Sequence, residues 1–449
     1  MNNRIKVVGA GLAGCEAAWR LANEGFPVDL IEMKPQKYTP AHSYPGFAEL
    51  VCSNSLKAAA LSSAAGLLKE EMRRLGSLTM ACAVETTVPA GGALAVDRTT
   101  FSDAVTRRIR AHPNIAVIHE ELEDIPGGSV VIATGPLTSP ALAGAIQRLC
   151  GGTLSFFDAA APIVSADSVN MDVAFAASRY GRGDADYVNC PMNREEYARF
   201  YDALIHAQTV ELHDFEKKDF RVYEGCMPVE VLAKRGEDSI RFGPLKPVGL
   251  RDPRTGTGSY AVVQLRKENR AGTMYNLVGF QTNLLFGEQK RVFSLIPGLE
   301  HAEFVRYGVM HRNTFLDSPR LLDTQFRWKA DGERGNLYFA GQITGVEGYV
   351  ESAASGLLAG LHLARGLSGK RPADLPEETM LGALSRHVGL GGLGDFQPMG
   401  CNMGLLPPLT EPVRGKKERY AALADRSLRS LACLMETEGI RGDTLENHC

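Results

Sequence analysis

The spacing of apolar residues changes twice near the start of the chain. Residues 4–9 (RIKVVG) and 27–32 (PVDLIE) are short, apolar-rich runs of the kind found in buried parallel strands. Between them the period becomes helical, and one face of residues 9–23 carries Leu12, Cys15, Ala18 and Leu21. A strand, a helix and a second strand within about thirty residues predict one βαβ crossover.

Similar patterns return later in the chain. The spacing predicts a helix over 100–112, a buried strand over 129–133, a late buried strand over 336–341 and a small-residue helix over 348–366. Residues 34–60, rich in Pro, Ser and aromatic residues, predict a long loop, which in a compact domain is usually functional. From about 160 to 325 the apolar runs become short and alternating, as in 260–265 (YAVVQL). No internal repeat is found.

The fold class that follows is α/β. We expect a Rossmann-like domain interrupted by an α+β insertion domain. Its first part would be residues 1–160, the insertion 161–325, and its second part 326–449 with a C-terminal tail. The late strand and helix would then complete the first domain from a distance in sequence.

Composition and charge narrow the function classes. A chain of 449 residues suggests two or three domains, and 44% hydrophobic with 22% charged residues is ordinary for globular proteins. A net charge of −3 gives no global case for nucleic acid or membrane, so a polyanion would need a local basic patch. Nine cysteines without CxxC spacing indicate a reducing compartment and no metal site. With no signal sequence and no long apolar stretch, we expect a cytoplasmic protein.

The turn between the first strand and helix carries a glycine fingerprint, Gly9-Ala10-Gly11-Leu12-Ala13-Gly14. In a GxGxxG motif the first glycine permits a tight turn, the second lets the backbone approach a pyrophosphate, and the third packs the helix on the strand. Glu32 ends the second strand, where a carboxylate accepts hydrogen bonds from an adenosine ribose. In this βαβ context the motif predicts a dinucleotide site rather than a chance glycine turn.

Two distant segments favour FAD over NAD as the resident dinucleotide. One is the Ala133-Thr134-Gly135 turn after a buried strand, and the other is the late strand ending in Gly341-Gln342. Two-dinucleotide flavoproteins commonly close the flavin site with Gly-Asp, and this chain has Gln342 at the position of that aspartate, where a contact with the ribityl chain is expected. Because the chain has a single fingerprint, a second nucleotide domain is absent, and a tightly held flavin reduced by transient NADPH or NADH is expected.

Several long, unusual segments carry a closer match. They are VVGAGLAGCEAAWRLA (7–22), IEMKP (31–35), LVCSNSLKA (50–58), PAGGALAVDR (89–98), FEKKDFRVYEGCMPVE (215–230), FGPLKPVGL (242–250), YNLVGFQTNL (275–284), FVRYGVMHRNTFLDSP (304–319), NLYFAGQITGVEGYVESAASG (336–356) and FQPMGCNMGLLPPL (396–409). Through them the chain resembles the TrmFO family, the folate- and FAD-dependent tRNA uracil-5-methyltransferases of bacteria. The resemblance implies a glutathione-reductase-like FAD domain with an insertion.

The reaction implied by the resemblance is transfer of the methylene carbon of methylenetetrahydrofolate to C5 of a tRNA T-loop uridine. Flavin electrons then reduce the carbon to methyl, and NAD(P)H supplies them. Uracil C5 is a poor nucleophile, so adding a thiolate at C6, or first activating the methylene carbon on the flavin, would lower the barrier. Removal of the C5 proton also needs a base.

Two cysteines are the catalytic candidates. Cys52 lies in the long early loop, and Cys226 lies in a turn-rich stretch, Gly225-Cys226-Met227-Pro228. A cysteine is ordinarily a small buried hydrophobe, but the loop positions and family motifs reverse that interpretation for these two. We expect one thiol to attack C6 and the other to interact with the flavin or act as base. Cys15 and the remaining cysteines (82, 150, 190, 401, 433 and 449) are expected to be structural.

Two ring side chains stand near family motifs. Tyr349 precedes the late helix, where it would either stack on the flavin or folate ring or pack as a core residue. His311 ends a strand-like run, where a histidine is more often a satisfied interior group than a folate or flavin contact.

A local basic excess suggests an RNA surface. Residues 217–291 hold fourteen Lys and Arg against eight Asp and Glu, a local +6. Such runs are usually solvated faces, but this one surrounds Cys226, where bound RNA would need phosphate neutralisation and an unstacked uridine. No obligate protein partner is expected.

Three other functions stay open. The larger related enzyme acting at the wobble uridine carries an extra helical domain, whereas this chain has only a short tail over 415–449. A flavin oxidoreductase of small molecules would leave the basic segment and the loop cysteines unexplained. The same chemistry on ribosomal RNA is not excluded.

Overall fold

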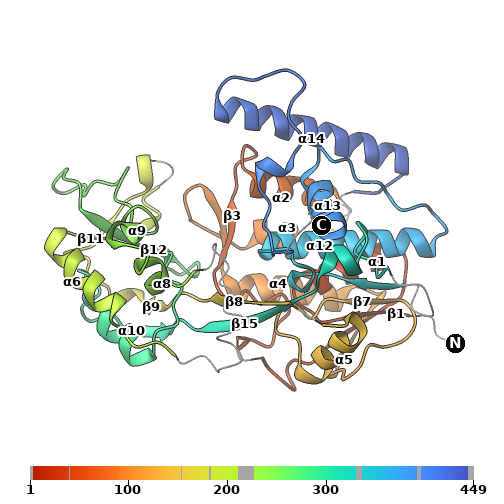
Figure 1. The fold of residues 1–449 in the computed structure, drawn as a ribbon, viewed down its shortest axis with the longest axis horizontal. Helices are drawn as coiled ribbons and strands as arrows, with labels where there is room; N and C mark the ends of the chain where they lie inside the picture. Colours follow the sequence, from red (N-terminus) through yellow and green to blue (C-terminus); the bar gives the residue numbers. More distant parts are fainter. Residues whose placement is uncertain are drawn as a thin grey trace.

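The computed structural model describes residues 4–39, 41–152, 154–181, 184–210, 227–329, 336–391 and 396–442, and at 154–159 and 311–313 it describes the backbone alone. These residues form two lobes (Figure 1). We name them the main lobe (residues 4–152 and 316–442) and the insertion lobe (160–309). Each lobe has a hydrophobic core of its own.

A parallel sheet of five strands forms the centre of the main lobe, in the order β16–β7–β1–β2–β6. The strands are β1 (Ile5–Val8), β2 (Val28–Glu32), β6 (Ile115–His119), β7 (Val130–Ile132) and β16 (Leu337–Phe339). Four of them confirm predicted strands. Because β16 pairs with β7, the late part of the chain completes the sheet that the first part begins. The α/β fold class is therefore confirmed.

The main lobe also contains nine described helices. They are α1 (Leu12–Asn23), α2 (Ala64–Arg74), α3 (Leu78–Glu85), α4 (Arg98–Ala111), α5 (Pro140–Cys150), α11 (Ser318–Leu321), α12 (Tyr349–Leu367), α13 (Met380–Leu390) and α14 (Lys416–Glu438). Of these, α1, α4 and α12 contact the strands of this sheet. The helices predicted over 9–23, 100–112 and 348–366 are confirmed by α1, α4 and α12. α12 packs directly on α1, since a Cβ added to Gly356 would lie 2.0 Å from the backbone oxygen of Ala13. Only glycine permits this approach.

One segment differs from the prediction, and a second, the C-terminal tail, has a helix that was not assigned from the sequence. The loop expected over 34–60 contains strand β3 (Ser55–Ala58), which pairs with β5 (Ala93–Val96) beside β4 (Thr87–Val88). The expected short tail is mostly α14, a helix of 23 residues. It forms because Leu423, Leu428 and Leu431 lie on one face and join the main-lobe core beside α2. Local composition did not reveal a partner so distant in sequence.

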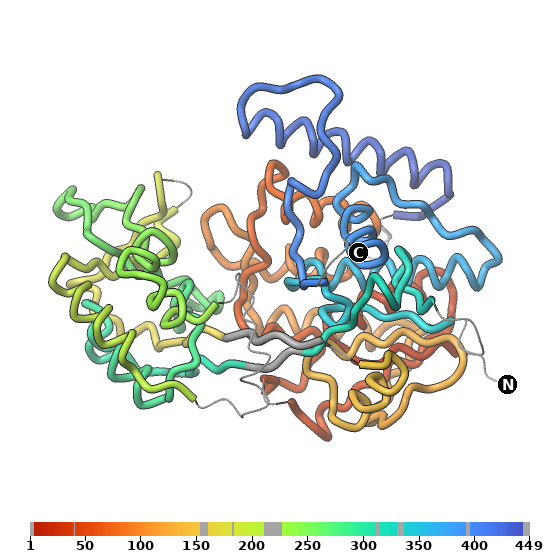
Figure 2. The backbone as a smooth tube through the Cα atoms, viewed as in Figure 1, coloured from red at the N-terminus to blue at the C-terminus, as the bar shows by residue number. Residues whose placement is uncertain are grey.

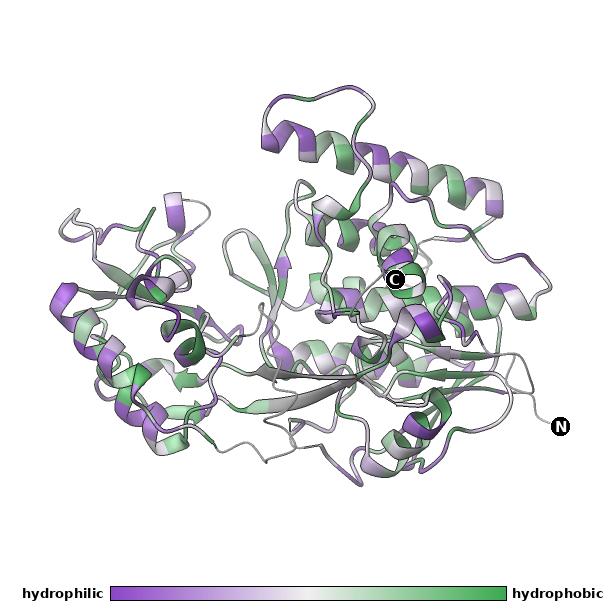
Figure 3. Cartoon of the chain, viewed as in Figure 1, coloured by the Kyte–Doolittle hydropathy of each residue, from purple (hydrophilic) through white to green (hydrophobic). Residues whose placement is uncertain are grey.

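The insertion lobe is built on an antiparallel sheet of six strands, in the order β10–β11–β12–β13–β9–β14. The strands are β9 (Ile163–Ser165), β10 (Phe175–Ala176), β11 (Tyr187–Met192), β12 (Ala261–Lys267), β13 (Met274–Leu277) and β14 (Phe304–Arg306). Helices α6 (Arg194–Ile205), α8 (Val229–Ala233), α9 (Glu237–Arg241) and α10 (Phe286–Phe293) accompany it. In Figure 3 hydrophilic turns mark the outer helices α6 and α14.

A two-stranded ribbon joins the lobes. The chain enters the insertion lobe along β8 (Leu154–Ala159) and returns along β15 (Met310–Phe315), and the two strands pair antiparallel over six residues. Figure 2 shows the first and last parts of the chain together in the main lobe, with the middle part apart from them. We propose that the domain division expected at 160 and 325 lies at this ribbon.

Candidate functional site

The glycine turn places an open backbone at the start of α1. Gly9 has φ +95°, and an added Cβ would lie 2.7 Å from the Ala133 oxygen, while a Cβ on Gly14 would lie 1.7 Å from the Gly9 oxygen. These two glycines are therefore required by packing. A Cβ on Gly11 would meet no atom within 4 Å. Gly11 thus faces open space, as expected where a ligand approaches the backbone.

The N-terminus of α1 also indicates a ligand site. Gly11 is its N-cap, and no side chain caps it. Uncapped amides at a helix N-terminus bind anions such as a pyrophosphate. Next to it, the buried carboxylate of Glu32 accepts hydrogen bonds from the backbone N–H of Ala10 (2.7 Å) and of Lys34 (2.9 Å). These two bonds fix the carboxylate at the end of β2, and its remaining lone pairs fit ribose hydroxyls.

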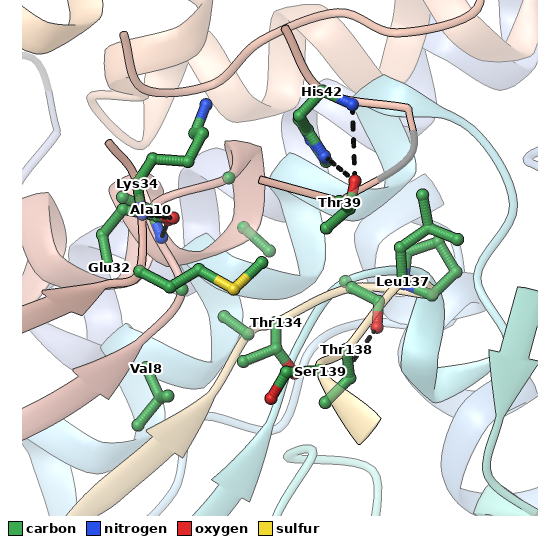
Figure 4. Close-up of a pocket in the computed structure, with 18 of the residues that line it drawn as sticks. Val8, Ala10, Glu32, Lys34, Thr39, His42, Thr134, Leu137, Thr138 and Ser139 are labelled. Carbon is green, nitrogen blue, oxygen red and sulfur yellow. Dashed lines mark hydrogen bonds between the residues drawn. The ribbon is translucent and has the colours of Figure 1, made fainter. Parts of the chain in front are cut away.

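A single groove continues from this turn along the carboxyl edge of the main sheet (Figure 4). Its wall is built from segments that follow all five strands: 9–13 after β1, 33–34 after β2, 120–122 after β6, 133–139 after β7 and 341–342 after β16. Ligands of open α/β sheets bind at this edge. Of the residues predicted to hold the cofactor, Gly9, Ala10, Gly11, Leu12, Ala13, Glu32, Gly341, Gln342 and Tyr349 line the groove, and Gly14 packs behind it.

Gln342 has a fixed orientation at one end of the groove. Its Nε2 donates to both carboxylate oxygens of Glu347, at 3.0 and 3.1 Å, and Glu347 is buried. With the nitrogen engaged, the carbonyl oxygen of the amide points to the other side. Gln342 therefore offers a hydrogen-bond acceptor at the position where the sequence predicts a ribityl contact.

At the same end, Tyr349 holds the turn that carries Cys52. The backbone N–H groups of Cys52 and Ser53 donate to the Tyr349 hydroxyl oxygen (2.7 and 3.2 Å), and that hydroxyl donates to Cys52 Sγ (3.0 Å). Burial, and then the neighbouring Cys52, raises the pKa of Tyr349 well above its usual range, so the phenol remains a donor. The structure thus brings two predicted site residues, far apart in sequence, into direct contact.

The loop over 34–60 supplies groove residues that the sequence did not single out. Thr39 and His42 face the segment 134–139 across the groove (Figure 4), with 2.6 Å between Thr39 Oγ1 and His42 Nδ1. Burial lowers the pKa of His42, although the nearby Glu49 opposes the shift. The only available signal was the length of the loop.

Comparisons with known proteins show the family of the chain. The sequence profile of the family described as "Glucose inhibited division protein A" matches residues 4–371. The methylenetetrahydrofolate--tRNA-(uracil-5-)-methyltransferase TrmFO of Desulfitobacterium hafniense (strain Y51) is 59% identical over 97% of this chain and 99% of its own length. The protein of the same name from Heliobacterium modesticaldum is also 59% identical, over 96% and 98%. The chain belongs to the TrmFO family.

The solved structure of GidA from Aquifex aeolicus superposes with a TM-score of 0.70 at 16% identity, covering 97% of this chain and 76% of that one. At this identity the likeness establishes the fold alone. It agrees with the split main lobe that the TrmFO resemblance implied.

The structure describes the other predicted site residues to different extents. Cys226 lies outside the described residues, although α8, which follows it closely, is anchored by a buried Glu230 that accepts from Thr282 Oγ1 (2.8 Å). His311 lies on β15 opposite Asp158, with its side chain outside the described part. Cys15 is buried 3.4 Å from the Ala10 oxygen, and burial raises its pKa, as in a structural thiol.

The remaining cysteines fall into three groups. Cys82, Cys150 and Cys190 are buried, and burial raises the pKa of each thiol. Cys401 is half-buried, and its N–H donates to Glu351 (3.0 Å). Cys433 is exposed on α14, and Cys449 lies outside the described residues.

The basic segment expected to bind RNA is mostly on the surface of the insertion lobe. Eight of its fourteen cations are exposed: Lys234, Arg235, Lys246, Arg251, Arg254, Arg270, Lys290 and Arg291. Arg241 and Lys267 are half-buried, and Lys217, Lys218 and Arg221 lie outside the described residues. Arg266 is buried and contributes no surface charge. In the described part of the chain, no helix is long and apolar enough to cross a bilayer.

Proposed function

We propose that this chain is a folate- and FAD-dependent methyltransferase that forms 5-methyluridine at a T-loop uridine of tRNA. Its TrmFO relatives carry that carbon donor and that substrate in their names. The observation that carries the proposal is the Cys52 thiol, which is held by Tyr349, a residue that lines the dinucleotide groove. A nucleophilic thiol beside such a groove suits carbon transfer to a pyrimidine.

The residues of the groove fit FAD. Glu32 would hold the adenosine ribose, the segment 9–13 with the α1 N-terminus the pyrophosphate, and Gly341 with the Gln342 carbonyl oxygen the ribityl chain. When bound, the flavin supplies the electron pair that reduces the transferred carbon to methyl, and NADPH or NADH restores it. The residues of this chain bind and orient the flavin and shield the reacting groups from solvent.

The two cysteines divide the covalent work. One thiolate adds to uracil C6, which raises the electron density at C5, and elimination of the same thiolate follows loss of the C5 proton to a base. The other thiol faces the flavin or serves as that base. Tyr349 supports Cys52 in either role, because a donor directed at sulfur stabilises the thiolate over the thiol.

The exposed cations of the insertion lobe are the proposed tRNA surface. They belong to the insertion lobe, whose sequence range also includes Cys226, and they would neutralise the phosphates of a bound tRNA. We place the reaction in the cytoplasm, where tRNA is found, and propose no obligate protein partner. Ribosomal RNA and a small molecule are the less favoured substrates, since the relatives are named for tRNA.

The test is direct. Purified protein loaded with FAD is incubated with carbon-labelled methylenetetrahydrofolate, NADPH or NADH, and unmodified tRNA or ribosomal RNA, and digested nucleosides are separated by mass spectrometry. We expect labelled 5-methyluridine from tRNA, lost when the T-loop uridine is replaced by cytidine. Product from ribosomal RNA alone, or none with either RNA, would refute the proposal. If Cys52→Ser and Cys226→Ser both keep full methylation with FAD bound, the thiol mechanism is wrong.

A further inference from the structure

The turn formed by Cys52, Ser53 and Asn54 is hydrogen-bonded to residues of both lobes. From the main lobe it is held by Tyr349, as described above. From the insertion lobe Arg266, on β12, reaches across: its Nε donates to Asn54 Oδ1 (3.0 Å), and its Nη2 donates to Ser53 Oγ (2.7 Å). One guanidinium therefore binds both residues that follow the reactive thiol.

Asn54 adds hydrogen bonds to both lobes. It is completely buried, and its Nδ2 donates to the Val96 oxygen in the main lobe (3.1 Å) and to the Lys267 oxygen in the insertion lobe (2.9 Å). Arg98, at the start of α4, makes a further link between the lobes. It donates to the Leu50 oxygen (2.7 Å) and forms an ion pair with the buried Glu268 of the insertion lobe. The stretch from Leu50 to Asn54 is thus fixed to the end of β12.

Arginine is suited to this position for a specific reason. Its planar fork of donors reaches two acceptors at once, which the single ammonium of lysine does not. Burial lowers the pKa of Arg266, and its neighbours Tyr187, Glu268 and Cys52 oppose that shift. Arg266 is one of the cations that the sequence assigned to the RNA surface, but it is only 7% exposed.

Other bonds join the lobes without touching the turn. The N–H of Gly91 donates to Asp186 (2.7 Å), and the N–H of Arg270 donates to Asp97 (3.0 Å). Neither bond involves the Arg266 side chain, so removing that side chain would leave both in place. The Tyr187 hydroxyl donates to the Ala90 oxygen (3.0 Å) but also interacts with Arg266. Loss of the Arg266 side chain should therefore release the Cys52 turn more than it separates the lobes.

We propose that Arg266 is a positioning residue that ties the Cys52 thiol to the RNA-binding lobe, so that bound RNA is sensed at the reactive sulfur. The inference rests on the proposed function for its RNA ligand. A shift of the insertion lobe of even a fraction of an ångström would be transmitted through the guanidinium to the turn. Misplacement of a reacting group by about 1 Å can cost about 100-fold in rate.

The experiment compares full-length, FAD-loaded Arg266→Gln and Arg266→Lys with wild type. For Arg266→Gln we expect kcat to fall about 10- to 100-fold, with FAD content and the Kd for unmodified tRNA within about twofold of wild type. Arg266→Lys keeps the charge but reaches one acceptor, so its kcat should lie between the two. Ser53→Ala, which removes one acceptor of Arg266, should cause a smaller loss in the same direction and serves if the Arg266 variants fail to fold.

The second readout is the alkylation rate of Cys52, followed by iodoacetamide labelling and peptide mass spectrometry with and without tRNA. We expect tRNA to change this rate in wild type and to leave it unchanged in Arg266→Gln. The matched control is Asp186→Ala, which removes an interlobe bond away from the turn and should behave as wild type.

Three results would overturn the proposal. They are a kcat within twofold of wild type in Arg266→Gln, a tRNA Kd weakened as much as kcat falls, or an equal loss in Asp186→Ala. Failure of the proposed function is separate: wild type would then make no 5-methyluridine, while alkylation of Cys52 without RNA would still differ between wild type and Arg266→Gln.

Discussion

His362 lies in the middle of α12, the helix whose first residue is Tyr349 and which packs on α1. It is 2% exposed, and within the described residues neither ring nitrogen has a hydrogen-bond partner. Burial, and then the charge of Arg365, lowers its pKa from 6.5 to about 4. We expect His362→Leu to make the main lobe more stable, and most of all in acid.

The magnitude follows from proton linkage. The pKa of His362 is lower in the folded protein than in the unfolded chain. Between pH 6.5 and about 4, His362 is therefore protonated in the unfolded chain but neutral in the folded protein. Stability is therefore lost as the pH falls through this window. At about 1.36 kcal/mol per pKa unit the full loss is about 3 kcal/mol, and it is absent in His362→Leu. Near pH 7 the variant should already gain about 1–3 kcal/mol, because two unsatisfied buried nitrogens disappear.

A buried carboxyl group works in the opposite direction. Burial raises the pKa of Glu71 from 4.5 to about 7, although it accepts hydrogen bonds from Ser427 and from the first amides of α13. Its folded pKa is above the unfolded one, so its contribution to stability is lost as the pH rises from 4.5 to 7. Between pH 4.5 and 6.5 the two groups partly cancel in the wild type. Differences between variants are therefore the quantity to measure.

The assay is urea unfolding from about pH 8 to about pH 4.5, followed by circular dichroism and by the fluorescence of released flavin. The wild type, His362→Leu, Glu71→Gln and the double variant are compared. The free energy of unfolding of His362→Leu should diverge upward from wild type below pH 6.5, and the acid loss should be steepest in Glu71→Gln. Parallel curves for wild type and His362→Leu over the whole range would refute the reasoning.

Three further predictions concern the site. Gly11→Ala should fold with a near-normal melting temperature but bind FAD at least about tenfold more weakly. Gly14→Ala should instead lower the melting temperature of the apoprotein, because only the Gly14 Cβ meets protein atoms. Calorimetry and flavin titration distinguish the two effects. Tyr349→Phe removes a hydrogen-bond donor to the Cys52 sulfur and an acceptor of two backbone amides. In steady-state assays kcat should fall about 10- to 100-fold with FAD retained. An unchanged kcat would count against the Cys52 role. Binding of tRNA, measured by filter retention, should weaken steeply with salt, and Lys246→Ala or Arg251→Ala should each reduce the slope by about one, whereas a flat salt response contradicts the basic surface.

The nucleotide half of the site could be predicted because its requirements are local. A turn that brings Gly9 to φ +95° and Gly14 against its oxygen allows no other residue, so the fingerprint is visible in sequence. The parallel strands, buried on both faces, likewise leave continuous apolar runs. Even the late strand β16 was recognisable, although its pairing with β7 joins distant parts of the chain.

The thiol half could not be predicted in the same way. The contact of Tyr349 with Cys52, and that of Arg266 with Asn54, joins elements that meet only after both lobes have formed. No spacing in the sequence records such a meeting, and Arg266 was indistinguishable from the surface cations around it. Gln342 shows the same limit, since its acceptor became apparent only once Glu347 was seen to hold its nitrogen.

The ribbon of β8 and β15 has a consequence for how such enzymes can diversify. Since the chain leaves and re-enters the main lobe on adjacent, hydrogen-bonded strands, everything between them is a cassette with neighbouring ends. The main sheet draws no strand from that cassette, so exchanging it would leave the nucleotide edge intact. Selection could then alter which nucleic acid is read while the redox chemistry stays the same, provided that each new cassette again supplies a partner for the turn at Cys52.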